Sequence, residues 1–179
     1  MTMTVADIAW YVLRVTYGRE IPLKKYLDDN QIENFIPMQY QMIEKNGKKS
    51  KKLLPVIHNL IFVKTSKQTI DEFKPLIELK MPVRYIMDRS KKLPMVVPEC
   101  QMQHFIAVSG TCDENLVYLK SSINFKRGMK VRIKSGIFAG VEGEFVRIKG
   151  DRRVVVAING IMAVATAFVH PSMVEEIKA

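Results

Sequence analysis

Basic residues at alternate positions near the C-terminal end are the first residues whose types and spacing suggest chemistry. Lys130, Arg132 and Lys134 alternate with Val131 and Ile133, a pattern that predicts a strand with one buried and one exposed face. A row of cations on an exposed face can contact the phosphates of a nucleic acid or the acidic groups of a protein. Four glycines surround this strand, and the last three lie at points where a tight turn or a close approach of two backbones disfavours a Cβ atom. They are Gly128, Gly136, Gly140 and Gly143.

The whole chain shares this basic character. Its 179 residues include 28 Lys and Arg against 18 Asp and Glu, which gives a net charge of +10. Residues 1–123 and 124–179 both contribute to the excess. Charge of this size fits a polyanionic partner and equally fits a solvated, lysine-rich surface, so motifs must decide between them.

Catalytic and metal-binding patterns are missing from the sequence. His58, His104 and His170 are scattered, and no phosphate-binding loop, nucleophile elbow or zinc-protease motif is present. Cys100 and Cys112 stand far apart, without the spacing of a zinc site or a disulfide framework. We therefore expect no enzyme activity, no cofactor and no metal site. The sequence also has no signal peptide and no membrane-spanning run, so we expect a cytoplasmic monomer without membrane contact.

Strands and helices alternate in the first 110 residues. Apolar runs predict strands over 10–16, 34–43, 53–64, 83–87 and 93–97, with Pro37 marking an edge or a bulge. Helical spacing predicts helices after Pro22, from a capping box at Thr65 and Gln68, and after Pro98. We expect Pro75 to shorten or kink the second helix. This order predicts a ferredoxin-like α+β domain, in which two helices cover an antiparallel sheet.

A polar segment interrupts this pattern at residues 44–52. Asn46 and Gly47 are typical of a hairpin turn. Lysines flank this turn, and they suit either an electrostatic arm that reaches nucleic acid or a solvated loop. They are Lys45, Lys48, Lys49, Lys51 and Lys52.

The remaining residues predict a linker and a second domain. Residues 111–123 are rich in turn-forming residues, although the apolar stretch 116–119 should dock on one of the domains. From residue 124 to 179, short strands separated by turns such as Asn159-Gly160 predict a small all-β SH3-like barrel.

Five features, in this order along the chain, resemble the NusG family of transcription factors. The chain has an opening Trp10-Tyr-Val-Leu strand, a lysine-rich hairpin, two further apolar strands, and a run that resembles the KOW motif. The apolar strands lie at 55–63 and 81–86, and the KOW-like run extends from Phe125 to Gly143. The resemblance implies an N-terminal NGN domain over 1–110 and a KOW domain over 124–179. The His58-Asn59 pair stands where the family has Pro-Gly, and this departure makes the chain similar to specialised paralogues of the RfaH and UpxY type.

The resemblance also implies partners and the residues that bind them. The NGN domain of this family binds the clamp helices of RNA polymerase through an apolar surface, which implies Ile57, Leu60, Phe62, Val83 and Tyr85 here. Upstream or non-template DNA is expected at Arg14, Arg19, Lys24, Lys25 and Arg84. The KOW domain recruits a ribosomal protein or Rho, or contacts nascent RNA, which implies Lys130, Arg132, Lys134, Phe138, Arg152 and Arg153.

The function implied is elongation or antitermination at specific operons, such as capsular polysaccharide loci, through suppression of pausing or termination. Two alternatives stay open. The chain is also compatible with an RNA-binding or ribosome-associated KOW protein that does not touch polymerase, and with the general housekeeping NusG factor.

Overall fold

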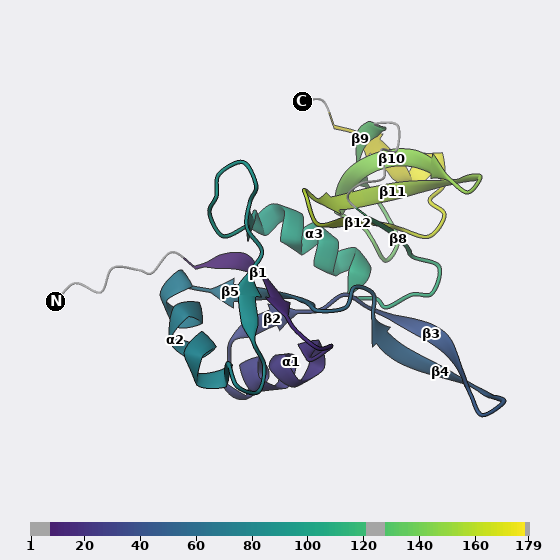
Figure 1. Ribbon diagram of the computed structural model, residues 1–179. Helices are drawn as coiled ribbons and strands as arrows, with labels where there is room; N and C mark the ends of the chain where they lie inside the picture. The colour runs from purple at the N-terminus through teal and green to yellow at the C-terminus, as the bar shows by residue number, and fades with distance from the viewer. Residues whose placement is uncertain (1–7, 121–127, 178–179) are drawn as a thin grey trace. The chain divides into compact units, whose positions relative to one another are not determined.

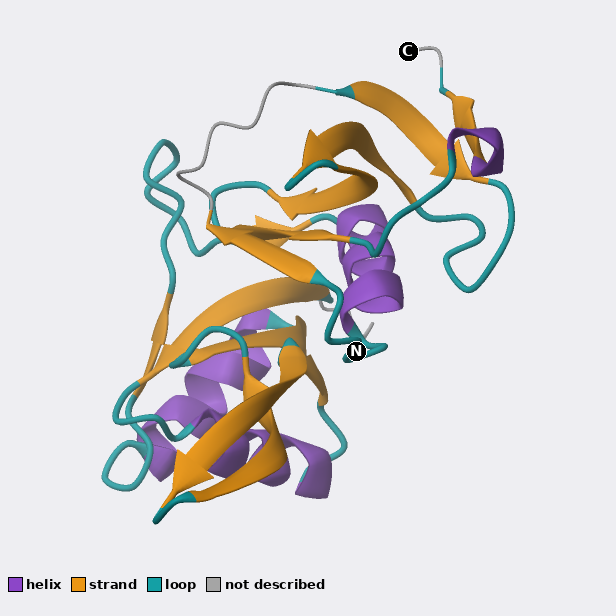
Figure 2. Cartoon of the chain, turned by 90° about the vertical axis from the view of Figure 1, so that its right-hand side faces the viewer, coloured by secondary structure: helices purple, strands orange, loops and turns teal. Residues whose placement is uncertain are grey.

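The computed structural model describes residues 8–120 and 128–177 of the chain. Contacts between Cα atoms divide it into two units, one formed by 8–36 with 57–99 and the other by 37–56 with 100–177. Figure 1 labels the elements of both units, and Figure 2 distinguishes helices from strands. No helix of the described residues is long and apolar enough to cross a membrane.

The first unit is an antiparallel sheet with two helices. Its strands follow the order β2-β5-β1-β6, and β7 also pairs with β1. Trp10 and Val12 point to one face of β1 while Tyr11 and Leu13 point to the other, and all four are buried. The elements are β1 (Ala9–Val15), α1 (Glu20–Asp29), β2 (Glu33–Phe35), β5 (Leu60–Thr65), α2 (Lys67–Ile77), β6 (Val83–Tyr85) and β7 (Val96–Val97).

Two long predicted strands are each broken into two. The strand predicted over 34–43 is divided at Pro37 into β2 and β3 (Met38–Lys45), which belong to different sheets. The strand predicted over 53–64 is divided into β4 (Lys48–Pro55) and β5 by a loop in which Asn59 has a φ of 65°. Proline lacks the N–H that would continue a sheet ladder, which explains the first break.

Helix α2 begins one residue later than the predicted capping box. Its N-cap is Ser66, whose side chain accepts a hydrogen bond from the backbone N–H of Thr69. The prediction of Thr65 and Gln68 was therefore wrong, although a hydroxyl at the N-cap meets the same need for an acceptor. The helix ends at Ile77, two residues after Pro75.

The second unit contains the hairpin β3–β4, helix α3 (Glu99–Ser109) and a sheet of six strands. The sheet order is β13-β9-β10-β11-β12-β8, with every neighbouring pair antiparallel. Val146, Val155, Ala163 and Ala165 form a buried cluster in it. The remaining bounds are β8 (Val117–Lys120), β9 (Met129–Ile133), β10 (Glu142–Ile148), β11 (Asp151–Ile158), β12 (Met162–Ala165), the 3-10 helix η1 (Pro171–Met173) and β13 (Val174–Glu176).

Strand β8 lies inside the predicted linker and pairs with β12. This confirms that the apolar stretch 116–119 docks on a domain. The last residues of that linker, 121–123, and Phe125 of the KOW-like run lie outside the described residues.

Candidate partner-binding site

A groove at the end of β1 brings together residues from both predicted binding sets. It has a volume of about 580 Å³, and we call it the β1–β6 groove. Arg14 and Arg84 lie directly opposite each other on β1 and β6, and both are exposed. No acidic side chain of the described chain forms an ion pair with either. The lining residues are Arg14, Val15, Thr16, Tyr17, Asn59, Arg84, Tyr85 and Ile86.

The two arginines repel each other because they lie side by side, and this repulsion lowers the stability of the fold. Like charges directly opposite each other on a sheet are destabilising by some tenths of a kcal/mol, up to about 1 kcal/mol. A bound anion would remove this repulsion, because phosphate oxygens accept hydrogen bonds from guanidinium groups in a fork geometry. The arrangement of Arg14 and Arg84 is thus suited to a phosphate group.

A strained loop forms one wall of the β1–β6 groove. Tyr17 and Gly18 follow β1 with φ values of 61° and 63°, a region that residues with a Cβ seldom occupy. The side-chain oxygen of Asn59 accepts a hydrogen bond of 2.7 Å from Gly18 N–H, and its backbone oxygen accepts one of 3.1 Å from Val15 N–H. These bonds hold Tyr17 with 82% of its surface exposed, and the Arg19 guanidinium lies 5.7 Å from its ring centroid.

Tyr85 forms the opposite wall and is held by helix α2. Its hydroxyl donates a 2.9 Å hydrogen bond to Asp71, and the Lys74 ammonium lies 4.5 Å from the ring centroid. Burial and this hydrogen bond raise the pKa of the Tyr85 phenol well above its ordinary value. Hydrogen bonds from Lys67 and then Tyr85 lower the pKa of Asp71. Tyr85 is therefore a neutral, half-buried and fixed aromatic ring.

Three of the five residues predicted to contact polymerase are buried. Leu60, Phe62 and Val83 have exposed fractions of 6%, 0% and 6%, which leaves little side-chain surface for a partner. Ile57 and Tyr85 are half-buried. The pattern of β5 did not reveal this, because all of 60–63 is buried and neither face of the strand is open.

Other apolar residues of the first unit are exposed. Met87 and Val96 expose 47% and 48% of their surface. Val96 pairs with Tyr11, whose ring packs edge-on against Tyr85 at a centroid distance of 5.9 Å. Met87 forms a bridge with Pro94, two residues before Val96. We call Tyr85, Met87 and Val96 the apolar patch. Sequence reasoning missed Met87 and Val96 because both fall in apolar runs, 83–87 and 93–97, that were predicted as strands and looked like core.

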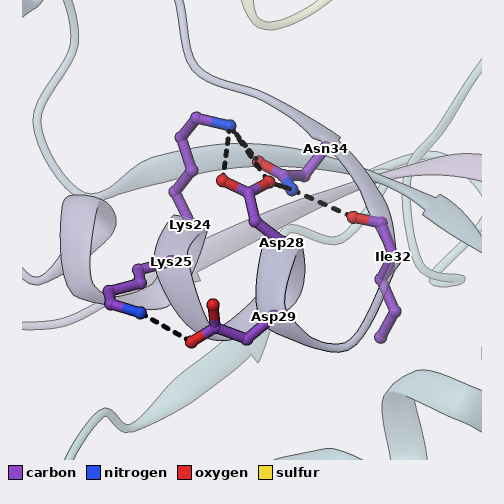
Figure 3. Close-up of polar contacts among 6 residues, drawn as sticks. All are labelled: Lys24, Lys25, Asp28, Asp29, Ile32 and Asn34. Carbon is purple, nitrogen blue, oxygen red and sulfur yellow. Dashed lines mark hydrogen bonds and ion pairs between the residues drawn. The ribbon is translucent and has the colours of Figure 1, made fainter.

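Two of the five residues predicted to bind DNA are neutralised within helix α1, as Figure 3 shows. Lys24 forms an ion pair of 3.1 Å with Asp28, and Lys25 forms one of 2.8 Å with Asp29. Asn34 donates a hydrogen bond of 2.7 Å to Asp28, and this bond, followed by those from Lys24, lowers the pKa of Asp28. The structure thus places Arg14 and Arg84 in the β1–β6 groove, and Arg19 lies near it because it contacts the ring of Tyr17. The two lysines are not part of this groove.

Two of the six residues predicted for the KOW partner surface are also buried. Arg153 donates hydrogen bonds of 2.8 Å to the carbonyl oxygens of Asn115 and Thr166, and Phe138 has an exposed fraction of only 7%. Its neighbour Ile137 exposes 79% of its surface. The other four lie at the surface, and Arg132 forms ion pairs with Glu142 and Glu175. They are Lys130, Arg132, Lys134 and Arg152.

Metal chemistry finds no support within residues 8–120 and 128–177. No group of three or more His, Cys, Asp or Glu side chains there could hold a metal ion. Both cysteines are free thiols.

Comparisons with known proteins identify the family. A search of curated proteins found no match. A solved structure described as showing domain interaction in NusG of Thermotoga maritima is 23% identical, with a TM-score of 0.47, and the match covers 96% of this chain and 98% of that chain. The family model described as transcription termination factor nusG matches residues 8–106, more than half of the chain. Its members are non-enzymatic transcription factors that work with RNA polymerase. This chain belongs to the NusG family.

Proposed function

We propose that this chain is a specialised NusG-type elongation and antitermination factor, similar to the RfaH and UpxY paralogues. Residues 1–110 form its NGN domain and bind the clamp helices of RNA polymerase. Residues 111–123 link this domain to an SH3-like KOW barrel at 124–179. The family match over residues 8–106 is the observation that carries the proposal. Five of the six strands of the second sheet, β9 to β13, lie within 124–179 and support its last part.

The apolar patch is the docking surface that we propose for the clamp helices. A helical partner is recognised through exposed apolar and aromatic anchors. Tyr85 is held in place by Asp71 and Lys74, while Met87 and Val96 add open apolar surface. Of the residues implied by the resemblance, Tyr85 and the half-buried Ile57 stay in this proposal.

The β1–β6 groove is the proposed contact for upstream or non-template DNA. Arg14 and Arg84 supply two uncompensated charges for phosphates, and the exposed ring of Tyr17 provides a flat surface on which a base can stack. The groove and the apolar patch share Tyr85. Polymerase and DNA would therefore be bound at adjacent places on one unit.

Suppression of pausing follows from differential binding. A factor shifts the equilibrium between two clamp states only by the difference in its affinity for them. We propose that this chain binds the closed, active clamp more tightly, so paused states become less populated. The KOW domain would meanwhile hold a ribosomal protein, Rho or nascent RNA through Lys130, Lys134, Arg152 and Ile137, which are exposed.

Binding of the full chain to purified bacterial RNA polymerase tests the proposal. The variant Met87→Glu/Val96→Glu should weaken binding by more than about tenfold, because it places two charges in a desolvated contact. Leu76→Glu/Leu79→Glu is the matched control, since both leucines are highly exposed on the same unit and lie outside the apolar patch. Equal loss in both variants, or no binding by the unmodified chain, would contradict the proposal.

Templates distinguish a specialist from the general factor. A specialised factor should reduce pausing only on templates that carry its own recruitment element in the DNA. A reduction of similar size on unrelated templates would instead identify the housekeeping role. Binding of ribosomes or RNA without any binding of polymerase would favour the KOW-protein alternative.

A further inference from the structure

The hairpin β3–β4 is a ribbon of two strands with a basic tip. Its register is continuous from Met38 opposite Pro55 to Lys45 opposite Lys48, and Figure 1 shows the two strands running side by side to a closed end. Asn46 and Gly47 form the turn with φ values of 52° and 72°, as the two positive values of a type I′ turn require. Every residue from 44 to 53 is exposed.

The charge of this tip is largely uncompensated. Five lysines and one glutamate occupy residues 44–52. Lys51 forms an ion pair of 2.6 Å with Glu114, and Glu44 lies directly opposite Lys49, but no other tip lysine forms an ion pair in the described parts of the chain. Lys45 and Lys48 are directly opposite each other, which costs stability. Because a hairpin of two strands is only marginally stable by itself, the opposed Lys45 and Lys48 do not stabilise the fold.

The two faces of the ribbon differ in chemistry. Residues that pair across an antiparallel ribbon share a face, so Gln41 lies beside Lys52, and Lys45 lies beside Lys48. Ser50 and its half-buried partner Ile43 lie on the same face, which we call the polar face because its exposed side chains are polar. The opposite face carries Tyr40, Met42 and Leu53, all exposed, and also Lys51 and the directly opposed Glu44 and Lys49.

This geometry matches one kind of nucleic acid. The major groove of B-form DNA is about 12 Å wide and admits a two-stranded β-ribbon, whereas the major groove of A-form RNA is too narrow for side chains to read. Eight residues per strand give a length of roughly 27 Å. Gln41 can form two hydrogen bonds with adenine, and lysines can contact guanine or phosphates.

We infer that the polar face of the hairpin binds duplex DNA in the major groove, with the tip lysines on the flanking phosphates. The inference goes beyond the proposed function, because it concerns another surface and does not require polymerase. Its test is therefore carried out with the protein and DNA alone. The occupant follows from charge complementarity and from the width of the groove.

Fluorescence anisotropy with the full chain and a labelled 24-base-pair DNA duplex, between 50 and 200 mM salt, tests the inference. The variant Lys45→Gln/Lys48→Gln/Lys52→Gln should lose more than about tenfold in affinity, and its salt slope should fall by about 0.9 for each phosphate that the protein no longer neutralises. Gln41→Ala should weaken binding further on adenine-containing sites, while Met42→Ala on the opposite face should not.

The matched control is Lys24→Gln/Lys25→Gln/Lys67→Gln. It removes the same net charge, but each of these lysines is ion-paired with an aspartate four residues later. The control should keep both the affinity and the salt slope. In an Arg14→Gln/Arg84→Gln background, the hairpin substitutions should still cause the same fold loss of DNA affinity. This result would show that the hairpin binds DNA independently of the β1–β6 groove.

Three results would overturn the inference. The first is unchanged affinity and slope in the hairpin variant, with circular dichroism showing the native fold. The second is an equal loss of DNA affinity in the ion-paired control, which would show that the effect depends only on net charge. The third is equally tight, hairpin-dependent binding of an RNA duplex of the same sequence, which would exclude recognition through the DNA major groove.

Discussion

Helix α1 and the β1–β6 groove carry basic residues that look equivalent in the sequence but differ in their surroundings. Lys24 and Lys25 each face an aspartate one helical turn later, whereas Arg14 and Arg84 face each other. The helix therefore uses its charges for its own stability, as i,i+4 pairs do. The two arginines of the groove form no ion pair with an acidic side chain in the described parts of the chain. The number of cations in a segment is thus a poor guide to binding unless the positions of the nearest carboxylates are known.

The largest effect should appear where a basic residue is buried in the fold. Arg153→Ala removes the donor to the carbonyl oxygens of Asn115 and Thr166, and unsatisfied buried groups cost about 1–3 kcal/mol each. We expect a loss of roughly 3 kcal/mol in the free energy of unfolding, measured in urea. Its exposed neighbour provides the control, because Arg152→Ala should change stability by less than about 0.5 kcal/mol. Similar losses in both variants would refute the structural role of Arg153.

The next effect concerns the free arginines of the groove. Arg14→Ala/Arg84→Ala should weaken binding of single-stranded DNA by about tenfold, and the salt slope should fall by about 0.7 for each phosphate that is no longer neutralised. The same change should leave the fold as stable as before or slightly more stable, because it removes a cross-strand repulsion. Titration of the full chain by fluorescence anisotropy and unfolding in urea measure the two quantities. Undiminished DNA binding would show that the groove is not the site.

The paired lysines should give the opposite result. Lys24→Ala/Lys25→Ala should leave binding of single-stranded DNA within about twofold of the unmodified chain, while stability falls by roughly 0.3–0.5 kcal/mol for each pair. The same two assays apply. A loss of DNA affinity as large as that of the groove variant would remove the distinction between the two regions.

The smallest effect is a change in the acid dependence of stability. The pKa of Asp28 is lowered in the folded chain, chiefly by the hydrogen bond from Asn34. The stabilisation from Asp28 is therefore present above its ordinary value near 3.8 and is lost as the pH falls through the folded pKa. In urea unfolding between pH 6 and pH 2, the free energy of unfolding of Asp28→Asn should fall less steeply with decreasing pH than that of the unmodified chain. If the free energy of unfolding of Asp28→Asn fell with pH as steeply as that of the unmodified chain, Asp28 would make no contribution to acid sensitivity.

The sequence predicted features that depend on local signals. Asn46-Gly47 indicated the hairpin turn, and both residues adopt the positive φ values of that turn. The alternating pattern of Val131 and Ile133 predicted that they are buried, and they are. These features follow from backbone sterics and from residue spacing, which the sequence displays directly.

Features that depend on tertiary packing were not predictable in the same way. Leu60 and Phe62 lie on β5, where both faces are buried, so alternation alone could not show which side is exposed. The alternation of side chains along a strand did, however, indicate one buried residue that the prediction overlooked. Arg152 and Arg153 are adjacent in β11 and cannot both point outward, and Arg153 is the one that lies inside. In the loop before β10, Phe138 is buried and Ile137 exposed, a choice set by the loop backbone.

The lifetime of a transcriptional pause in a purified system, with and without this chain, tests the central claim most directly. We predict that the full chain shortens the pause and that Met87→Glu/Val96→Glu abolishes this effect, while Leu76→Glu/Leu79→Glu retains it. An effect on pausing that survives disruption of the apolar patch, or no effect of the unmodified chain on a template with its recruitment element, would contradict the account.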